Sequence, residues 1–211
     1  MQKTDTIIRR ATESDIPFLA RMVLLAETSG HELISYKKMF SLPDSDLVKK
    51  FEIVLRNEQE GHGLTYRSFI VAEQDGMLAA VASSYIEGEY GSSSHLMTGA
   101  LMNGFELEQI MRGYKKNAEY KDVQIVKSAG TVQLDSVAIL EEFRGKGLLK
   151  LIFDAHTENV RKKNVTELEI QVWAGNIAAI KAYEKLGYKI KIEKWRKNKN
   201  EGGRILMSKQ L

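Results

Sequence analysis

The amino-acid sequence predicts a single α/β (α+β) domain built around a mixed sheet. Strand-like runs alternate with amphipathic helical stretches, and the clearest pair is Val132 to Ile139 followed by a helix from Gly147. An Asp-Gly pair at residues 75–76 joins two apolar runs, which adds an antiparallel hairpin. The 211 residues suffice for one well-buried core and are short for two, so we expect one domain over residues 1–211.

The first half of the chain carries local signals for strands and helices. Residues 6–11 include adjacent isoleucines and predict a short strand, and helix-entry residues follow it. Apolar side chains spaced through residues 47–55 mark the inner face of a further helix. The runs Phe69 to Glu73 and Met77 to Ile86 flank the Asp-Gly pair and are expected to be antiparallel neighbours.

A short turn, Phe-Arg-Gly-Lys-Gly, connects the strand Val132 to Ile139 with the helix after it. The first N–H groups of a helix lack internal partners and the helix dipole leaves that end partly positive, so the junction suits an anion. Gly145 and Gly147 permit positive φ and close approach, while Arg144 and Lys146 add positive charge. A phosphate or diphosphate fits, although a glycine-rich connection with two solvated cations stays open.

Three more strands and one helix are expected after this junction. Residues 165–173 are strand-like and end at Ala174-Gly175-Asn176, and an apolar stripe over residues 177–186 predicts a helix. Residues 188–195 and 204–211 are then the last two strands, linked by a basic, solvated hairpin.

Composition narrows the classes of function. No run of about 18 apolar residues and no secretory leader is present, so we expect no membrane span and a cytoplasmic protein. The absence of cysteine removes disulfides, a thiolate nucleophile and thiolate zinc sites. The four histidines are scattered, which predicts no metal site, and a net charge of +3 does not predict nucleic-acid binding.

Two motifs resemble those of one known superfamily. Arg144-x-x-Gly147-x-Leu149, directly after a strand, resembles motif A of the GNAT superfamily of N-acetyltransferases, in which the last position is Gly or Ala. Leu149 departs from that pattern. Asn176-x-x-Ala179-x-x-x-Tyr183-x-x-x-Gly187-Tyr188 resembles motif B. The two partial matches in the right order cover Val132 to Tyr188, and the N-terminal half matches by element order.

The resemblance implies a mostly antiparallel central sheet that is splayed into a V, with flanking helices and acetyl-CoA lying in the V as co-substrate. The V opens between the strand ending at Ile139 and the strand ending at Trp173. The residues that it assigns to the cofactor are Val137, Ala138 and Ile139, which pair with the pantetheine arm; Arg144, Gly145, Lys146, Gly147, Leu148, Leu149 and Lys150, which hold the diphosphate; Asn176, which contacts the arm; and Tyr183, which points at the sulfur.

The reaction implied is acyl transfer from a thioester to an amine. An amine of pKa about 10.4 costs about 4.6 kcal/mol to hold neutral at pH 7, so a base is needed. Some relatives carry Glu five places before the motif B asparagine, where this chain has Gln171. Asp135 is the substitute that we expect, because it has the same parity as Val137 and Ile139, although an ordinary strand residue is an equal alternative. Tyr183 is expected to protonate the departing thiolate, and a plain core tyrosine is its alternative.

The acceptor side is less defined. In the family, the region between the first helix and the second strand helps to form the acceptor pocket. This makes Glu27, His31, Glu32 and Tyr36 candidates for substrate contact, with surface or satisfied buried residues as the simpler interpretation.

Residues 88–130 do not resemble the family core, so we expect a helical insertion there. Gly91-Ser-Ser-Ser predicts a flexible connection, and Met97, Met102 and Met111 are expected to pack in a core. A lid over the acceptor site or a dimer contact stays open for this segment.

The sequence thus predicts an N-acetyltransferase that moves the acetyl group of acetyl-CoA to a primary amine, with no metal. We expect a small-molecule acceptor rather than a protein, and a homodimer stays open. The alternative is a non-catalytic acyl-CoA-binding or regulatory module, which the missing glutamate at Gln171 favours.

Overall fold

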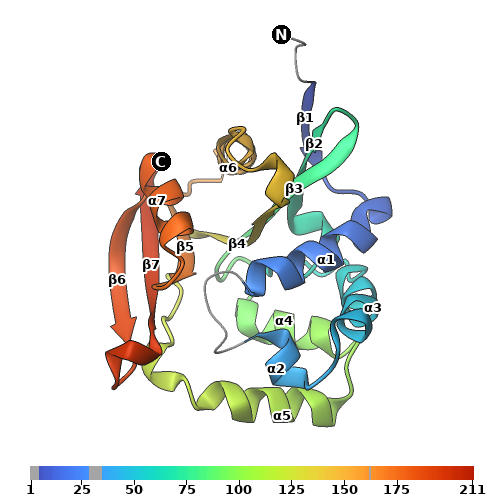
Figure 1. Ribbon diagram of the computed structural model, residues 1–211, viewed down its shortest axis with the longest axis vertical. Coiled ribbons are helices and arrows are strands. Elements are labelled where there is room, and N and C mark those ends of the chain that lie inside the picture. Colours follow the sequence, from blue (N-terminus) through green and yellow to red (C-terminus); the bar gives the residue numbers. More distant parts are fainter. Residues whose placement is uncertain (1–4, 29–34, 162) are drawn as a thin grey trace.

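The computed structural model describes residues 5–28, 35–161 and 163–211 (Figure 1). The strands are β1 (Thr6–Arg10), β2 (Phe69–Gln74), β3 (Met77–Ile86), β4 (Val132–Ile139), β5 (Glu167–Trp173), β6 (Lys189–Trp195) and β7 (Gly203–Gln210). The α-helices are α1 (Ile16–Glu27), α2 (Tyr36–Phe40), α3 (Asp44–Leu55), α4 (Ser93–Leu101), α5 (Leu107–Ala118), α6 (Leu148–Val160) and α7 (Ile177–Lys185).

The seven strands form one sheet in the order β1-β2-β3-β4-β5-β7-β6. Only the β4–β5 pair is parallel, which confirms the mixed, mostly antiparallel sheet. The predicted hairpin is confirmed as β2 and β3, with positive φ at Asp75 (51°) and Gly76 (79°). Such a turn twists in the same sense as its flanking strands, which explains why the Asp-Gly signal is reliable.

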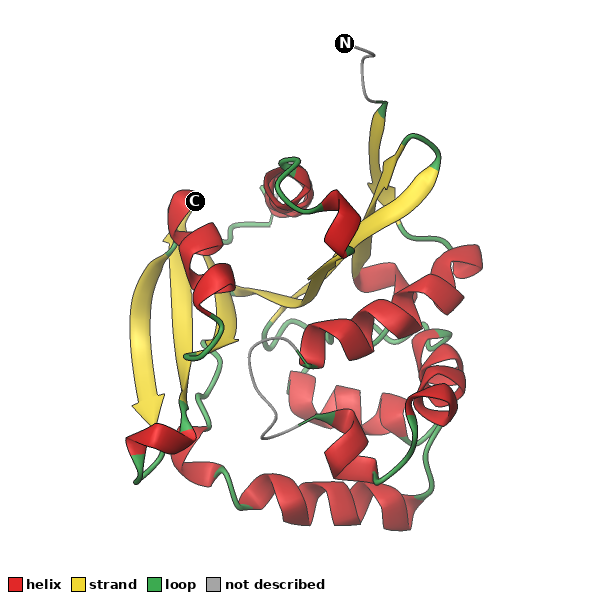
Figure 2. Ribbon diagram, in the orientation of Figure 1, coloured by secondary structure: helices red, strands yellow, loops and turns green. Residues whose placement is uncertain are grey.

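Helices cover both faces of the sheet (Figure 2). On one face, α1 and α3 form a core with Phe69 of β2 and Val81 of β3. On the other face, α6 packs on β2 and β3, and α7 packs on the half that contains β5 and β7. In the stretches of chain that the structure describes, none of the helices combines the length and apolar character needed to cross a bilayer.

The pairing between β4 and β5 is short. Val132, Gln133 and Leu134 pair with Leu168, Glu169 and Ile170, and no pairing follows although both strands continue. The sheet therefore opens into a V beyond this vertex, visible between the two groups of strands in Figure 1.

A bulge in β4 changes which side chains face each side of the V. Ser136 has a φ of 48°, and the register with β3 shifts at this point. Val137 and Ile139 consequently pack with the α6 core, whereas the Asp135 side chain lies next to Gly63 on the α1 side. The parity argument that placed Asp135 on the same face as Val137 and Ile139 is therefore wrong, because it assumed a regular strand.

Glu169 connects the strands at the point where β4 and β5 stop pairing. Its fully buried carboxylate accepts hydrogen bonds from Ser128, Thr131 and Gln133, and it pairs with Lys191 of β6 at 2.7 Å. Burial alone raises the pKa of Glu169, but Lys191 and the surrounding hydrogen bonds lower it to about 2. One ionised side chain thus connects β4, β5, β6 and the segment that leads into β4.

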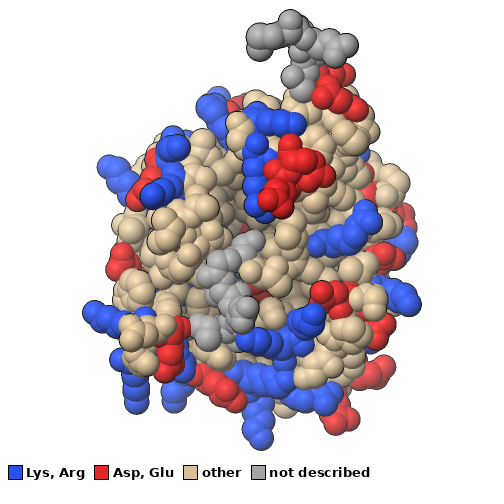
Figure 3. All heavy atoms as spheres, in the orientation of Figure 1, with Lys and Arg blue, Asp and Glu red and all other residues tan. Residues whose placement is uncertain are grey.

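The segment 88–130 differs in part from expectation. Its helices are α4 and α5, and Ser93 belongs to the first turn of α4, so the predicted flexible serine stretch is wrong there. Glu87 explains the difference, because its carboxylate accepts a hydrogen bond from the buried Ser93 hydroxyl. Lys and Arg side chains gather over α5 at the lower edge of the face in Figure 3.

Two of the three methionines predicted to be buried in this segment are exposed. The exposed fractions of Met102 and Met111 are 53% and 60%, so their assignment to a core is wrong. Met102 follows the end of α4, and Met111 lies on the outer face of α5, whose buried residues are Ile110 and Gly113. Met97 alone packs against the α1 core.

Replacing Glu169 by Ala is expected to lower the free energy of unfolding by about 3 kcal/mol, because buried donors and Lys191 lose their shared acceptor. The matched control is Glu167→Ala, which removes the second carboxylate on Lys191 but leaves Glu169 in place. Its expected loss is below about 1 kcal/mol. Urea unfolding of both variants checks this, and equal losses would contradict a special role for Glu169.

Candidate active site

A cavity of about 710 Å³ occupies the V and extends under α1, α2, α4 and α5. The predicted site residues that line it are Asp135, Val137, Ala138, Ile139, Arg144, Leu149, Asn176 and Tyr183. The other predicted residues, Gly145, Lys146, Gly147, Leu148 and Lys150, lie in the turn that leads from Arg144 into α6 and do not line the cavity.

The turn before α6 has the geometry of an anion site. Gly145 and Gly147 have φ values of 76° and 81°, as predicted, and no atom lies within 4 Å of a Cβ built on either. Among the described residues, the backbone N–H groups of residues 145–149 have no acceptor, because the first bonds of α6 run from Lys150 and Leu151 to Gly147. These amides are available to a phosphate group.

The charged side chains of the turn differ in availability. Arg144 is exposed, and its Nε lies 3.4 Å from the Ile139 carbonyl oxygen. Lys146 lies over the Phe143 ring at 4.8 Å. Lys150 instead pairs with Asp154 at 2.5 Å, and its amide is bound to Gly147, so its predicted contact with a diphosphate requires that ion pair to change. The Leu148 side chain is buried in the core.

The edge of β4 that faces β5 is open. Ala138 and Ile139 pair with β3 on one side, whereas in the described part of the chain β4 has no strand partner toward β5 beyond Leu134. Backbone groups in such a position can pair with an extended ligand as if it were an added strand. Residues 137–139 lie on this open edge, where we expect the pantetheine arm from the sequence.

Two residues of α7 reach the cavity. Asn176 caps this helix, and its Oδ1 accepts from the Ala179 amide at 3.1 Å. Tyr183 is buried and stacks on Phe153 with ring centroids 5.8 Å apart. Burial raises the pKa of the Tyr183 phenol and the Asp135 carboxylate adds to the shift, so the phenol keeps its proton at neutral pH.

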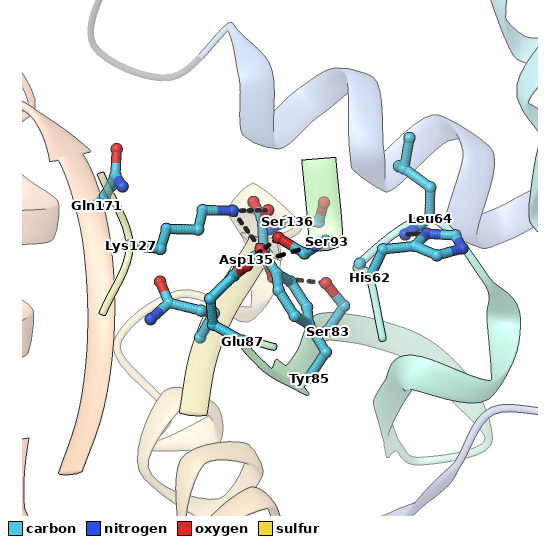
Figure 4. A network of polar contacts seen from close by, with 12 residues as sticks. His62, Leu64, Ser83, Tyr85, Glu87, Ser93, Lys127, Asp135, Ser136 and Gln171 are labelled. Atoms are coloured by element: carbon cyan, nitrogen blue, oxygen red, sulfur yellow. Dashed lines mark hydrogen bonds and ion pairs between the residues drawn. The ribbon is translucent and has the colours of Figure 1, made fainter. Parts of the chain in front are cut away.

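Asp135 belongs to a small polar network (Figure 4). Its Oδ1 accepts from the Ser136 amide at 2.8 Å, and its Oδ2 lies 4.0 Å from the ammonium of Lys127. Lys127 also donates to the Tyr85 hydroxyl. Burial opposes the charge on Lys127, yet Tyr85 and Asp135 leave its pKa raised, so the lysine is a cation beside the carboxylate.

Glu27 is the last residue of α1 and also lines the cavity. Burial raises its pKa to about 7, and repulsion from Asp135 adds to the shift, while Arg204 and Lys127 oppose it. A carboxyl group of this kind exchanges its proton near neutral pH. Of the other three candidates for acceptor contact, Tyr36 also lines the cavity, and His31 and Glu32 lie outside the described residues.

Sequence reasoning missed two cations of the cavity wall, Lys127 and Arg204. Lys127 lies in an irregular segment and Arg204 at the start of β7, and neither position carries a motif. Gln171 donates its side-chain amide to the Ile125 carbonyl oxygen at 3.2 Å, which gives it a structural partner. In the described stretches, no three His, Cys, Asp or Glu side chains gather in a way that suits a metal ion.

The site combines an open strand edge, free amides at a helix start and titratable groups across the cavity. The strand edge fits an extended amide arm, and the amides with Arg144 fit linked phosphates. Coenzyme A contains both an extended amide arm and linked phosphates. The fold and the site thus have the features of the class of acyl-CoA-dependent transferases.

Comparison with known proteins agrees with this class. A model of the acetyltransferase (GNAT) family matches residues 36–188, and the chain belongs to this family. No curated protein sequence matches the chain.

Solved structures with a similar fold share little sequence. An N-acetyltransferase from Staphylococcus aureus Mu50 has a TM-score of 0.68 at 15% identity, with 96% of this chain and 100% of that chain covered. A structure described as an acetyltransferase has a TM-score of 0.63 at 21% identity, with 97% and 98% covered. The yncA protein of Salmonella typhimurium, solved with its cofactor acetyl-CoA, has a TM-score of 0.55 at 14% identity, with 98% and 94% covered.

Proposed function

We propose that this protein is an N-acetyltransferase that uses acetyl-CoA to acetylate a primary amine. The observation that carries the proposal is the V between β4 and β5, with free amides at the start of α6 and with Glu27, Asp135 and Tyr183 in the wall of the cavity. Bound acetyl-CoA supplies a thioester carbonyl carbon, which forms a C–N bond with the amine as its C–S bond breaks.

Glu27 is the residue that we assign as general base. Its carboxylate form accepts a proton from the acceptor's ammonium group, so that the neutral amine can attack the thioester. A pKa near 7 lets Glu27 take up this proton and later release it to solvent. Asp135, the base expected from the sequence, already accepts from Ser136 and faces Lys127. In this proposal Asp135 attracts the amine and raises the pKa of Glu27 rather than taking the proton.

Tyr183 is the residue that we assign as general acid. The phenol donates its proton to the departing thiolate and regains one from solvent after product leaves. Its raised pKa keeps it protonated before the reaction, at the cost of a less favourable transfer to a thiolate of pKa about 8.5. In this proposal, backbone N–H groups near residues 137–139, on the open edge of β4, stabilise the oxyanion as it develops.

The acceptor would enter from the side opposite the α6 turn. Met97 of α4 and Tyr114 of α5 line that part of the cavity, so the 88–130 segment, which we propose to be a helical insertion in one domain, forms part of its wall. A walled cavity of this kind favours a small-molecule amine over a protein. A cytoplasmic location belongs to the same proposal.

Replacing Tyr183 by Phe is expected to lower kcat by about 10- to 10,000-fold with little change in acetyl-CoA affinity, because only the acidic proton is lost. Tyr188→Phe is the matched control, since Tyr188 lies beside Tyr183 but outside the cavity wall. Release of free CoA thiol with a panel of amines provides the measurement. Unchanged turnover would remove Tyr183 from this role, and acetyl-CoA binding without turnover in the wild type would favour the non-catalytic module.

The rate constant kcat/KM is expected to rise with pH through a midpoint near 7, since Glu27 accepts a proton only when it is ionised. Glu27→Gln should lose about 100- to 10,000-fold in rate and also lose this midpoint. Asp135→Asn tests the competing assignment in the same pH series. If the midpoint disappeared in Asp135→Asn and survived in Glu27→Gln, Asp135 would be the base.

A further inference from the structure

Arg204 is a charged residue of the cavity wall. It lies at the start of β7 opposite Trp173 of β5, and its guanidinium lies over the indole ring at 4.5 Å. The side chain is half-buried and lines the same cavity as Glu27 and Asp135. Burial lowers the pKa of Arg204, while the two carboxylates partly offset that effect, so a charged guanidinium is held in a poorly solvated place.

The Arg204 guanidinium lacks a carboxylate partner in the described part of the chain. Other arginines pair with acidic side chains: Arg9 with Asp15, Arg56 with Glu13, Arg67 with Glu58, Arg161 with Glu158 and Arg196 with Asp122. The arginines at positions 10, 21, 112 and 144 form no ion pair there either, but they are exposed to water. A half-buried guanidinium whose N–H donors have no acceptor among the described residues can take one from a ligand that enters the cavity.

Two carboxylates, those of Glu27 and Asp135, line the same cavity as Arg204. Glu27 and Asp135 influence Arg204 through the electric field but form no ion pair with it within 4.0 Å. The cavity thus separates a negative side, where an ammonium group is favoured, from a guanidinium whose planar donors match a carboxylate. Tyr36, Met39 and Leu101 add an apolar wall between the surrounding helices.

We propose that the acceptor carries a carboxylate as well as its amine, as a free amino acid with an apolar side chain does, and that Arg204 binds this carboxylate. The inference rests on the proposed acetyl transfer, since it names the substrate class of the same site. The amine then lies toward Glu27 and Asp135, next to the thioester arm. Arg204 thereby determines specificity and does not take part in proton transfer.

The experiment compares amino acids with the amines that remain after decarboxylation, namely phenylalanine with 2-phenylethylamine and leucine with 3-methylbutylamine. Calorimetry measures their affinity for the CoA-loaded protein, and mass spectrometry measures acetylated product with acetyl-CoA. We expect the wild type to bind at least one amino acid about 10-fold or more tightly than its amine. Arg204→Met should remove that preference and Arg204→Lys should keep part of it.

Arg21→Met is the matched control, because it removes an exposed guanidinium of α1 outside the cavity and should keep the wild-type preference. Equal affinity within every pair, or a preference that survives in Arg204→Met, would overturn the carboxylate site. Should Arg204→Met fail to fold, the wild-type pairs and Arg204→Lys decide alone. Arg204-dependent binding without acetylated product would refute the proposed transfer but not the carboxylate site. Acetylation of the plain amines alone would refute the carboxylate site but not the proposed transfer.

Discussion

The architecture depends on how early β4 and β5 stop pairing. Three residue pairs hold the strands together, and Glu169 binds its neighbours at that vertex. Because the pairing ends there, the rest of β4 presents backbone groups that no strand satisfies. Water can satisfy these groups, and an extended ligand can pair with them as an added strand, so the end of the pairing provides the place that we propose for the cofactor.

The bulge at Ser136 gives that edge two chemical faces. Before the bulge, Asp135 is directed to the α1 side, and after it Val137 and Ile139 return to the α6 core. A regular strand would put all three side chains on one face. The bulge therefore separates the charged half of the cavity from the apolar packing that holds α6, and the cofactor and acceptor sides can differ in polarity.

Sequence alone predicted the parts of the molecule that local geometry determines. The Asp75-Gly76 turn and the positive φ of Gly147 have short-range causes, so their signals were reliable. The orientation of Asp135 was mispredicted, because a bulge leaves no mark in the residue pattern. Arg204 was missed for a related reason: its role arises from β7 lying next to β5, which is a long-range pairing that one sequence does not reveal.

The central claim is that coenzyme A lies along the open edge of β4, with its diphosphate on the amides before α6. A crystal structure of the protein with acetyl-CoA tests it most directly. The account predicts phosphate oxygens within hydrogen-bond distance of the amides of residues 145–149 and a sulfur atom beside Tyr183. Acetyl-CoA bound elsewhere on the molecule, or with its phosphates away from that turn, would contradict it.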